Sequence, residues 1–270
     1  MHINVVHETR YTYDQPARQV VQILRLTPRN HRGQYVQHWN IDLDQDCRIV
    51  EHEDSFGNIT HTFSAGGPIE ALTVRIEGAV ETEETNGVVA GTAERLPLPL
   101  FLRQTGLTTA DAAIRRLARK CSSPNPLDAS HALMHAVGEA VEFQKKATHT
   151  TTSAAEALAA GRGVCQDFAH IFIAAARALA VPARYVSGYF VHGDGVTDHE
   201  AGHAWAEVYV PDLGWVAFDP ANNTCPGESY VRVAVGLDYL DAAPVRGVQA
   251  GGIEEAMSVG VNVTGSQQQQ

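Results

Sequence analysis

The stretch GRGVCQDFAH, residues 161–170, places one cysteine directly after two glycines and just ahead of an apolar run that continues to Leu179. The run predicts a helix, with Cys165 in its first turn. Unpaired backbone N–H groups and the positive end of the helix dipole stabilise a thiolate at such a position. A thiolate is a nucleophile, so the segment indicates covalent acyl transfer. A buried structural cysteine is the alternative, and this segment alone leaves it open.

Two later segments supply a base and a carboxylate. Residues 203–210, HAWAEVYV, and 215–219, WVAFD, are rich in aromatic and β-branched side chains and predict two strands. PDLG, residues 211–214, predicts the hairpin loop between them. The chain order is therefore a cysteine on a helix, then His203 on one strand and Asp219 on the next. This set provides a nucleophile, a base to take its proton and a carboxylate to orient the imidazole.

The register of that hairpin decides whether the histidine and the carboxylate meet. In one register His203 and Asp219 point to opposite faces of the sheet. In the register one residue away, a bulge at Gly214 pairs Tyr209 with Trp215 and makes His203 a diagonal neighbour of Asp219. We predict the bulged register, because a slip by one residue would separate the two side chains.

These segments resemble the bacterial transglutaminase-like cysteine peptidase family. The resemblance rests on residues 163–167 (GVCQD), 181–189 (VPARYVSGY), 203–208 (HAWAEV) and 214–222 (GWVAFDPAN). It extends to YTY (11–13), LRLTP (24–28), DSFGN (54–58), VRVAVGLDY (231–239) and PVRG (244–247). The resemblance implies a papain-like core with Cys165 as nucleophile, His203 as base and Asp219 as the orienting carboxylate. By analogy, it also implies a partner system in which a ligase-type enzyme tags peptides.

The chain is predicted to be an α+β protein in two parts. Alternating residues 3–9 and 72–80 predict strands of a β-rich N-terminal domain over residues 1–90. A linker is expected over 91–105, with its two prolines. The transglutaminase-like core, a helix-borne cysteine packed on an antiparallel sheet or barrel, is expected over 106–265, and a disordered tail over 266–270. Helices are predicted from about Thr109, over 126–143 and over 153–159, and the pair Gly66-Gly67 predicts a turn.

Composition excludes several classes of function. Lys and Arg number 20 and Asp and Glu number 31, a formal net charge of −11. This balance argues against nucleic acid and anionic membranes as partners. No apolar run approaches the length of a bilayer span, and Met1–Arg10 lacks a signal-peptide core, so cytoplasmic location is expected. Four cysteines without a CxxC pair indicate neither a disulfide framework nor a cysteine zinc site.

A competing motif overlaps the triad. Residues 199–203, HEAGH, match the HExxH pattern of zinc proteases, which requires both histidines on one face of a helix. Gly202 and the strand that follows disfavour a helix there, and no third ligand is evident downstream. We therefore predict no metal and no cofactor.

Other residues near the triad are candidates for binding substrate or the oxyanion. The Cys165 backbone N–H is the natural first oxyanion donor, and the further candidates are Gln166, Trp205, Trp215 and Tyr189. Asp167 is predicted to cap the helix and His170 to be a core histidine. The predicted reaction is hydrolysis of a peptide or isopeptide bond through a Cys165 thioester, with a peptide or protein as substrate. An amine-accepting transglutaminase or ligase, and a non-catalytic peptide-binding module, are the alternatives.

Overall fold

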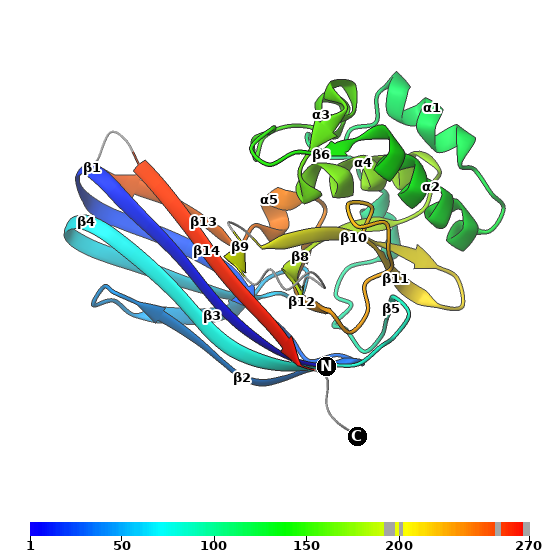
Figure 1. Ribbon diagram of the computed structural model, residues 1–270. Coiled ribbons are helices and arrows are strands. Elements are labelled where there is room, and N and C mark those ends of the chain that lie inside the picture. The colour runs from blue at the N-terminus through cyan, green and yellow to red at the C-terminus, as the bar shows by residue number, and fades with distance from the viewer. Residues whose placement is uncertain (192–197, 200–201, 252–254, 267–270) are drawn as a thin grey trace.

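A long, bent antiparallel sheet is built mainly from the N-terminal part of the chain (Figure 1). The computed structural model describes residues 1–191, 198–199, 202–251 and 255–266. Strands β1 (His2–Thr27) and β4 (Ile59–Thr82) pair along most of their length, and the sheet order is β2-β4-β1-β14-β9. Strand β3 pairs β4, and β13 pairs β1. The remaining bounds are Gln34–Leu43 for β2, Ile49–Glu53 for β3, Asp198–His199 for β9, Val245–Ala250 for β13 and Glu255–Ser266 for β14.

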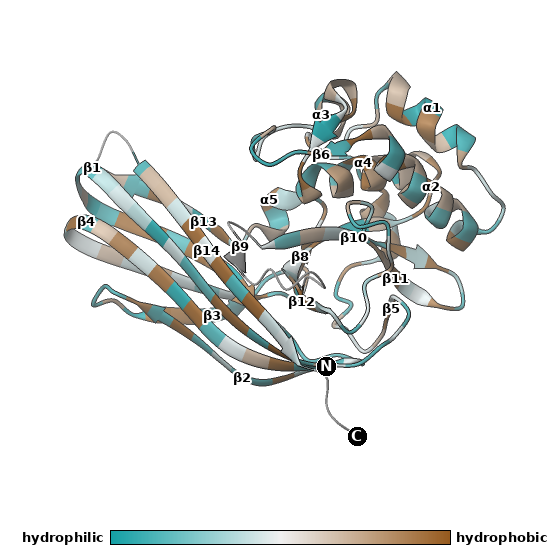
Figure 2. Cartoon of the chain, viewed as in Figure 1, coloured by the Kyte–Doolittle hydropathy of each residue, from teal (hydrophilic) through white to brown (hydrophobic). Residues whose placement is uncertain are grey.

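Alternating side chains explain why one face of this sheet is buried. Along β1 every second residue from Ile3 to Tyr13 is buried, as the period of two predicts. Figure 2 shows the same alternation of apolar and polar residues along the long strands. The predicted turn at Gly66-Gly67 is wrong: both glycines lie inside β4, where the β1–β4 register shifts. Without side chains they let the paired strands bend, so the chain changes direction without breaking the sheet.

The second sheet carries the core, in the order β12-β8-β10-β11-β5. Its strands are β12 (Tyr230–Gly236), β8 (Ala183–Phe190), β10 (His203–Val210), β11 (Gly214–Phe218) and β5 (Val88–Val89). Helix α4 (Cys165–Ala178) packs against β8 and β10. It is buried on every side from Gln166 to Arg177, as expected for a helix enclosed by protein.

Three helices cover the side of α4 that faces away from this sheet (Figure 1). They are α1 (Ala112–Lys120), α2 (Pro126–Ala140) and α3 (Ala154–Ala160). The predicted capping box of α3 is present: the Glu156 N–H donates to the Ser153 hydroxyl, and the Ser153 N–H donates to the Glu156 carboxylate. The smaller elements are η1 (Leu98–Leu102), β6 (Glu142–Phe143), β7 (Arg162–Gly163) and α5 (Tyr239–Ala242). The fold is thus α+β, as predicted, with a helix that begins at Cys165 packed on an antiparallel sheet.

The predicted division of the chain differs from the two sheets. Strands β13 and β14, placed in the core by the prediction, pair with β1 and complete the N-terminal sheet. Strand β5, from the predicted N-terminal domain, joins the core sheet beside β11. Phe101 of the predicted linker is buried against Trp215. Unpaired sheet edges and exposed aromatic rings are costly, so distant segments complete each layer.

Two further predictions concern the C-terminal tail and the location of the protein. Ser266 belongs to β14, so the predicted tail begins at least one residue too early, and 267–270 lie outside the described residues. Every helix within the described ranges is too short or too polar to cross a bilayer. The cytoplasmic location stays a prediction.

Candidate active site

Cys165 is the first residue of α4 and is partly exposed to solvent. The backbone N–H groups of the first helical turn have no partner inside the helix and point toward its start. These groups and the helix dipole favour negative charge on the sulfur. The same N–H of Cys165 is available to an oxyanion formed beside the sulfur.

Local contacts fix the start of this helix. The Asp167 carboxylate accepts a hydrogen bond from the Val164 N–H (2.8 Å) and another from the Thr148 hydroxyl (2.6 Å). A Cβ on Gly163 would lie 2.7 Å from that carboxylate, so only glycine fits there. Burial raises the pKa of Asp167, while the bonds from Thr148 and Val164 oppose the rise. The predicted capping role of Asp167 is therefore confirmed.

The hairpin that carries His203 has the predicted register, but the predicted bulge is wrong, because Gly214 pairs directly with Val210. Tyr209 pairs with Trp215 and Val210 with Gly214, whose φ of +82° suits glycine. His203 and Asp219 therefore emerge on the same face of the sheet. This register places the His203 side chain of β10 next to the Asp219 side chain, which follows β11.

His203 lies between Cys165 and Asp219. Its Nε2 is 2.6 Å from Asp219 Oδ2, and the Cys165 side chain lies near enough to the ring to raise the pKa of His203. With Nε2 engaged by Asp219, Nδ1 is the nitrogen left for the sulfur. The rings of Phe190, Trp205 and Tyr230 lie 5.5, 6.1 and 6.0 Å from the His203 ring. These rings keep most water away from the imidazole.

The environment favours a protonated His203. Burial by itself lowers its pKa, but the charge and hydrogen bond of Asp219, with the interaction with Cys165, raise the pKa from 6.5 to about 10. Burial acts to raise the pKa of Asp219, yet His203, Asn222 and Tyr230 hold it below its ordinary value. A stable imidazolium beside Cys165 is what a thiolate needs as a counterion.

Asp219 is held by donors on both of its oxygens. Oδ2 accepts from the Tyr230 hydroxyl (2.8 Å) and the Asn222 side-chain amide (2.8 Å) as well as from His203. Oδ1 accepts from the backbone N–H groups of Ala221 (3.0 Å) and Asn222 (3.3 Å). Sequence reasoning missed Tyr230 and Asn222. Asn222 stands at the end of the quoted 214–222 segment, whereas no local signal marks Tyr230.

Two of the candidate binding residues lie near the triad but are engaged elsewhere. The Gln166 side-chain amide donates to the Thr150 carbonyl (3.2 Å), which uses one of its two amide hydrogens. Trp205 is 1% exposed and packs edge-on against Tyr230, so it backs His203 rather than facing solvent. Gly188 leaves room for this ring, because a Cβ there would lie 2.7 Å from it.

The other two candidates lie away from the triad. Trp215 shares the face of Asp219 but stands four residues earlier, about 13 Å along the strand, where Arg184 covers its ring at 3.9 Å. Tyr189 is 3% exposed, and its hydroxyl lies 2.9 Å from His7 Nδ1 of β1. The prediction that these two line the site is wrong in position, because tertiary packing turns both rings into core contacts.

The sequence predictions also concern two further histidines, His170 and His199. His170 is fully buried, burial lowers its pKa to about 4, and its Nε2 accepts from the Tyr239 N–H (3.1 Å). It is the core histidine that we predicted. His199 and His203, the ends of the HExxH match, lie on strands of different sheets, and Glu200 lies outside the described residues. The helical arrangement that this zinc motif requires is therefore not present.

Two protein families match most of the chain. The bacterial transglutaminase-like N-terminal region matches residues 3–81, and the transglutaminase-like superfamily matches residues 114–220, which include Cys165, His203 and Asp219. The uncharacterized protein ML0607 of Mycobacterium leprae is 30% identical over 97% of this chain and 98% of its own length. The uncharacterized protein Rv2569c of Mycobacterium tuberculosis is 28% identical over 90% of this chain and 86% of its own.

A solved structure shares the complete architecture. The crystal structure of a candidate cysteine protease from Cytophaga hutchinsonii superposes with a TM-score of 0.75, covering 98% of both chains at 21% identity. At this identity the likeness establishes the fold. With both domain types matched in order and a relative aligned along its whole length, this chain belongs to the transglutaminase-like superfamily and carries the bacterial transglutaminase-like N-terminal region.

Proposed function

We propose that the protein hydrolyses a peptide or isopeptide bond through a thioester on Cys165. The observation that carries the proposal is the arrangement of Cys165, His203 and Asp219, brought together from α4, β10 and the end of β11, in which His203 bonds Asp219 and interacts with Cys165. A packing cysteine would need neither an imidazole nor a buried carboxylate beside it. This arrangement therefore favours an enzyme over a non-catalytic binding module.

The reaction follows from the protonation states at the site. The Cys165 thiolate attacks the amide carbonyl, and the Cys165 N–H donates to the oxyanion. The His203 imidazolium then gives its proton to the leaving amine as the C–N bond breaks and the thioester remains. Neutral His203 next takes a proton from water, which attacks the thioester and releases the acid and the thiolate. Asp219 keeps the imidazole oriented and stabilises its charged form throughout.

Water is the acceptor that we favour, because Cys165 is partly exposed to solvent. A primary amine that replaced water would yield a new amide by the same steps. By family analogy, a peptide tagged by a ligase-type enzyme is a suitable substrate. Mass spectrometry of the products of a peptide amide, with and without an added primary amine, distinguishes the two acceptors.

The test of the triad needs no substrate. Alkylation by limiting iodoacetamide is followed by peptide mapping from about pH 5 to about pH 9 in wild type and His203→Ala. We expect selective labelling of Cys165 at acid pH in the wild type and a shift toward the ordinary thiol pKa of about 8.5 in the variant. Cys165→Ala removes that labelled peptide and is the control. Wild-type labelling that begins only near pH 8.5 would mean that no ion pair forms, and the proposed function would fail.

A further inference from the structure

Tyr230 ties the catalytic carboxylate to a different strand. Of the donors that the described residues offer to Asp219, Ala221 and Asn222 belong to its own turn, and His203 is the base. Tyr230 is the first residue of β12. Its hydroxyl donates to Asp219 Oδ2, the oxygen that also bonds His203. Burial and the charge of Asp219 raise the pKa of Tyr230, so the hydroxyl stays protonated and donates. The place of Asp219 relative to β10 thus depends on the place of β12.

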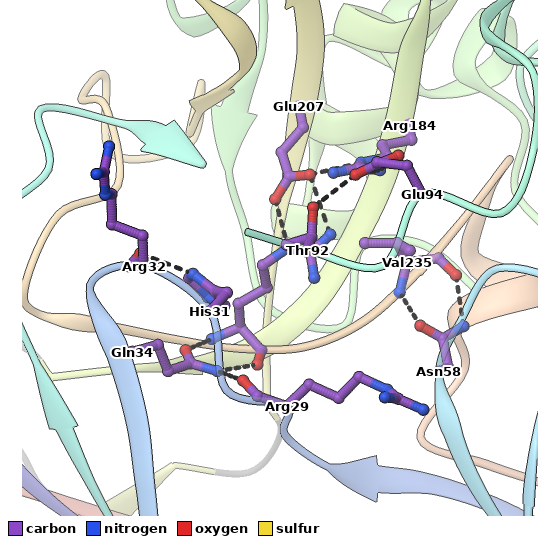
Figure 3. A network of polar contacts seen from close by, with 11 residues as sticks. Arg29, His31, Arg32, Gln34, Asn58, Thr92, Glu94, Arg184, Glu207 and Val235 are labelled. Carbon is purple, nitrogen blue, oxygen red and sulfur yellow. Dashed lines mark hydrogen bonds and ion pairs between the residues drawn. The ribbon is translucent and has the colours of Figure 1, made fainter. Parts of the chain in front are cut away.

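Within the described residues, strand β12 lies at the edge of the core sheet: it pairs with β8 on one side and with no strand on the other. Two buried amide side chains of the N-terminal domain take its free backbone groups (Figure 3). Gln34 accepts from the Arg232 N–H (2.7 Å) and donates to the Arg232 carbonyl (2.8 Å). Asn58 makes the same pair of bonds with Val235 (2.8 and 2.7 Å). On this side of β12 the two amide side chains take the place of a neighbouring strand.

The two attachments differ in their distance from the triad. Gln34 holds the residue two positions from Tyr230, while Asn58 holds one five positions away. The Arg232 side chain adds a second link, since it donates to the buried Glu207 of β10 (2.7 Å). The Thr82 hydroxyl of β4 also donates to the Glu228 carbonyl just ahead of β12. The start of β12 is therefore held by β8 on one side and by the N-terminal domain on the other.

We propose that the N-terminal β domain positions the catalytic carboxylate: Gln34 fixes the start of β12, and Tyr230 there fixes Asp219. The inference rests on the proposed function, because it assigns a role within that same triad. Both residues are positioning residues that act through Asp219. When Asp219 is held less firmly, it supports the imidazolium less well, and the thiolate forms only at higher pH. Among the described residues, the titratable groups that face His203 are Cys165 of α4, Asp219 after β11 and Tyr230 of β12.

The test is the pH profile of Cys165 alkylation, measured on the full chain. Tyr230→Phe should move the midpoint upward by about one pH unit, which makes labelling below the midpoint about tenfold slower. Gln34→Met keeps the side-chain length but loses the bonds to Arg232. It should also move the midpoint upward and slow labelling below the midpoint about threefold. Asn58→Leu is the matched control: it loses the equivalent bonds to Val235 and should leave the profile unchanged, even if its Tm falls as much.

A double variant checks that the two residues act along one route. Gln34→Met combined with Tyr230→Phe should match Tyr230→Phe alone, since the glutamine has no hydroxyl left to position. Independent addition of the two effects, or equal profiles for Gln34→Met and Asn58→Leu, would overturn the role of the N-terminal domain. A shift to lower pH in Tyr230→Phe would mean that the hydroxyl only weakens the charge of Asp219, which also overturns the proposal.

The outcome for the wild type separates this inference from the proposed function. An acid-shifted wild-type profile with unchanged variants overturns the inference alone. A wild-type profile centred near the ordinary thiol pKa of about 8.5 overturns both.

Discussion

The two halves of the active site are held in different ways. On the nucleophile side, Asp167 bonds Val164 and Thr148, 3 and 19 residues away, and Gln166 bonds Thr150, 16 residues away. On the base side, the strand that anchors Asp219 is bonded by Gln34 from 198 residues away. The contacts at the helix start come from at most 19 residues away, whereas Asp219 is held by its own turn and, through Tyr230, by a strand that is bonded to the other sheet. Substitutions on the two sides should therefore fail differently.

The largest expected effect is on the base side, in Asp219→Asn. An amide cannot support the imidazolium, so we expect catalysis to fall by about 10²- to 10⁴-fold. The raised pKa of His203, about 10, means that its ion pair contributes stability fully below the ordinary value of 6.5 and loses it as pH rises through 10. The gap in unfolding free energy between variant and wild type should therefore narrow between pH 6.5 and pH 10. Thermal unfolding across that range measures it.

Asp212→Asn is the control for this substitution, because Asp212 is an exposed carboxylate in the loop of the same hairpin. It should leave both the rate and the pH profile unchanged. If the difference in unfolding free energy between Asp219→Asn and wild type stays constant with pH, the assigned ion pair is contradicted.

The next largest effect is expected within the core sheet, at Glu207 of β10. Glu207 is fully buried and pairs with Arg184 and Arg232, which together hold its pKa near 2 against the effect of burial. Glu207→Gln leaves two buried guanidinium groups with a weaker partner, and we expect a loss of about 3–5 kcal/mol in unfolding free energy. Denaturant unfolding at neutral pH checks the value. Glu94→Gln, the partly exposed partner of Arg184, should cost at most about 1 kcal/mol. Equal losses of unfolding free energy in Glu207→Gln and Glu94→Gln would show that burial of the carboxylate does not decide the size of the loss.

The smallest effect is expected on the nucleophile side, in Thr148→Val. The variant loses one hydrogen bond to the buried Asp167 carboxylate and should destabilise the chain by about 1.5–3 kcal/mol. Cys165 alkylation should keep its acid midpoint, because the bond from Val164 still holds the helix start. Thr150→Val is the control, since Thr150 contributes its backbone carbonyl to the contact with Gln166. A midpoint shift as large as that of Tyr230→Phe would contradict the contrast between the two sides.

Sequence reasoning succeeded where short-range geometry decides. The capping pair Ser153 and Glu156 is three residues apart, and the hairpin loop leaves few ways to pair Tyr209 with Trp215. It failed where a partner is distant. Nothing local indicates that β13 and β14 return to β1, or that Tyr189 packs against His7 rather than the triad.

Trp215 illustrates why proximity in sequence misled. It stands four residues before Asp219 on the same face, which is a sound reason to expect both at one site. The strand separates them, and Phe101 from the predicted linker packs against the indole with ring centroids 5.0 Å apart. A segment more than 100 residues away thus decides what the tryptophan does.

By itself, the sequence determined a cysteine at a helix start, a histidine and a carboxylate on a hairpin, and the register that brings these two together. Helix ends, turns and strand faces follow from contacts a few residues apart, so the pattern of side chains suffices to predict them. Only the tertiary structure decided that Tyr230 and Gln34 stand behind Asp219, and that the last strands belong to the first sheet. Such pairings depend on which surfaces the whole chain buries together, and no short stretch of sequence contains that information.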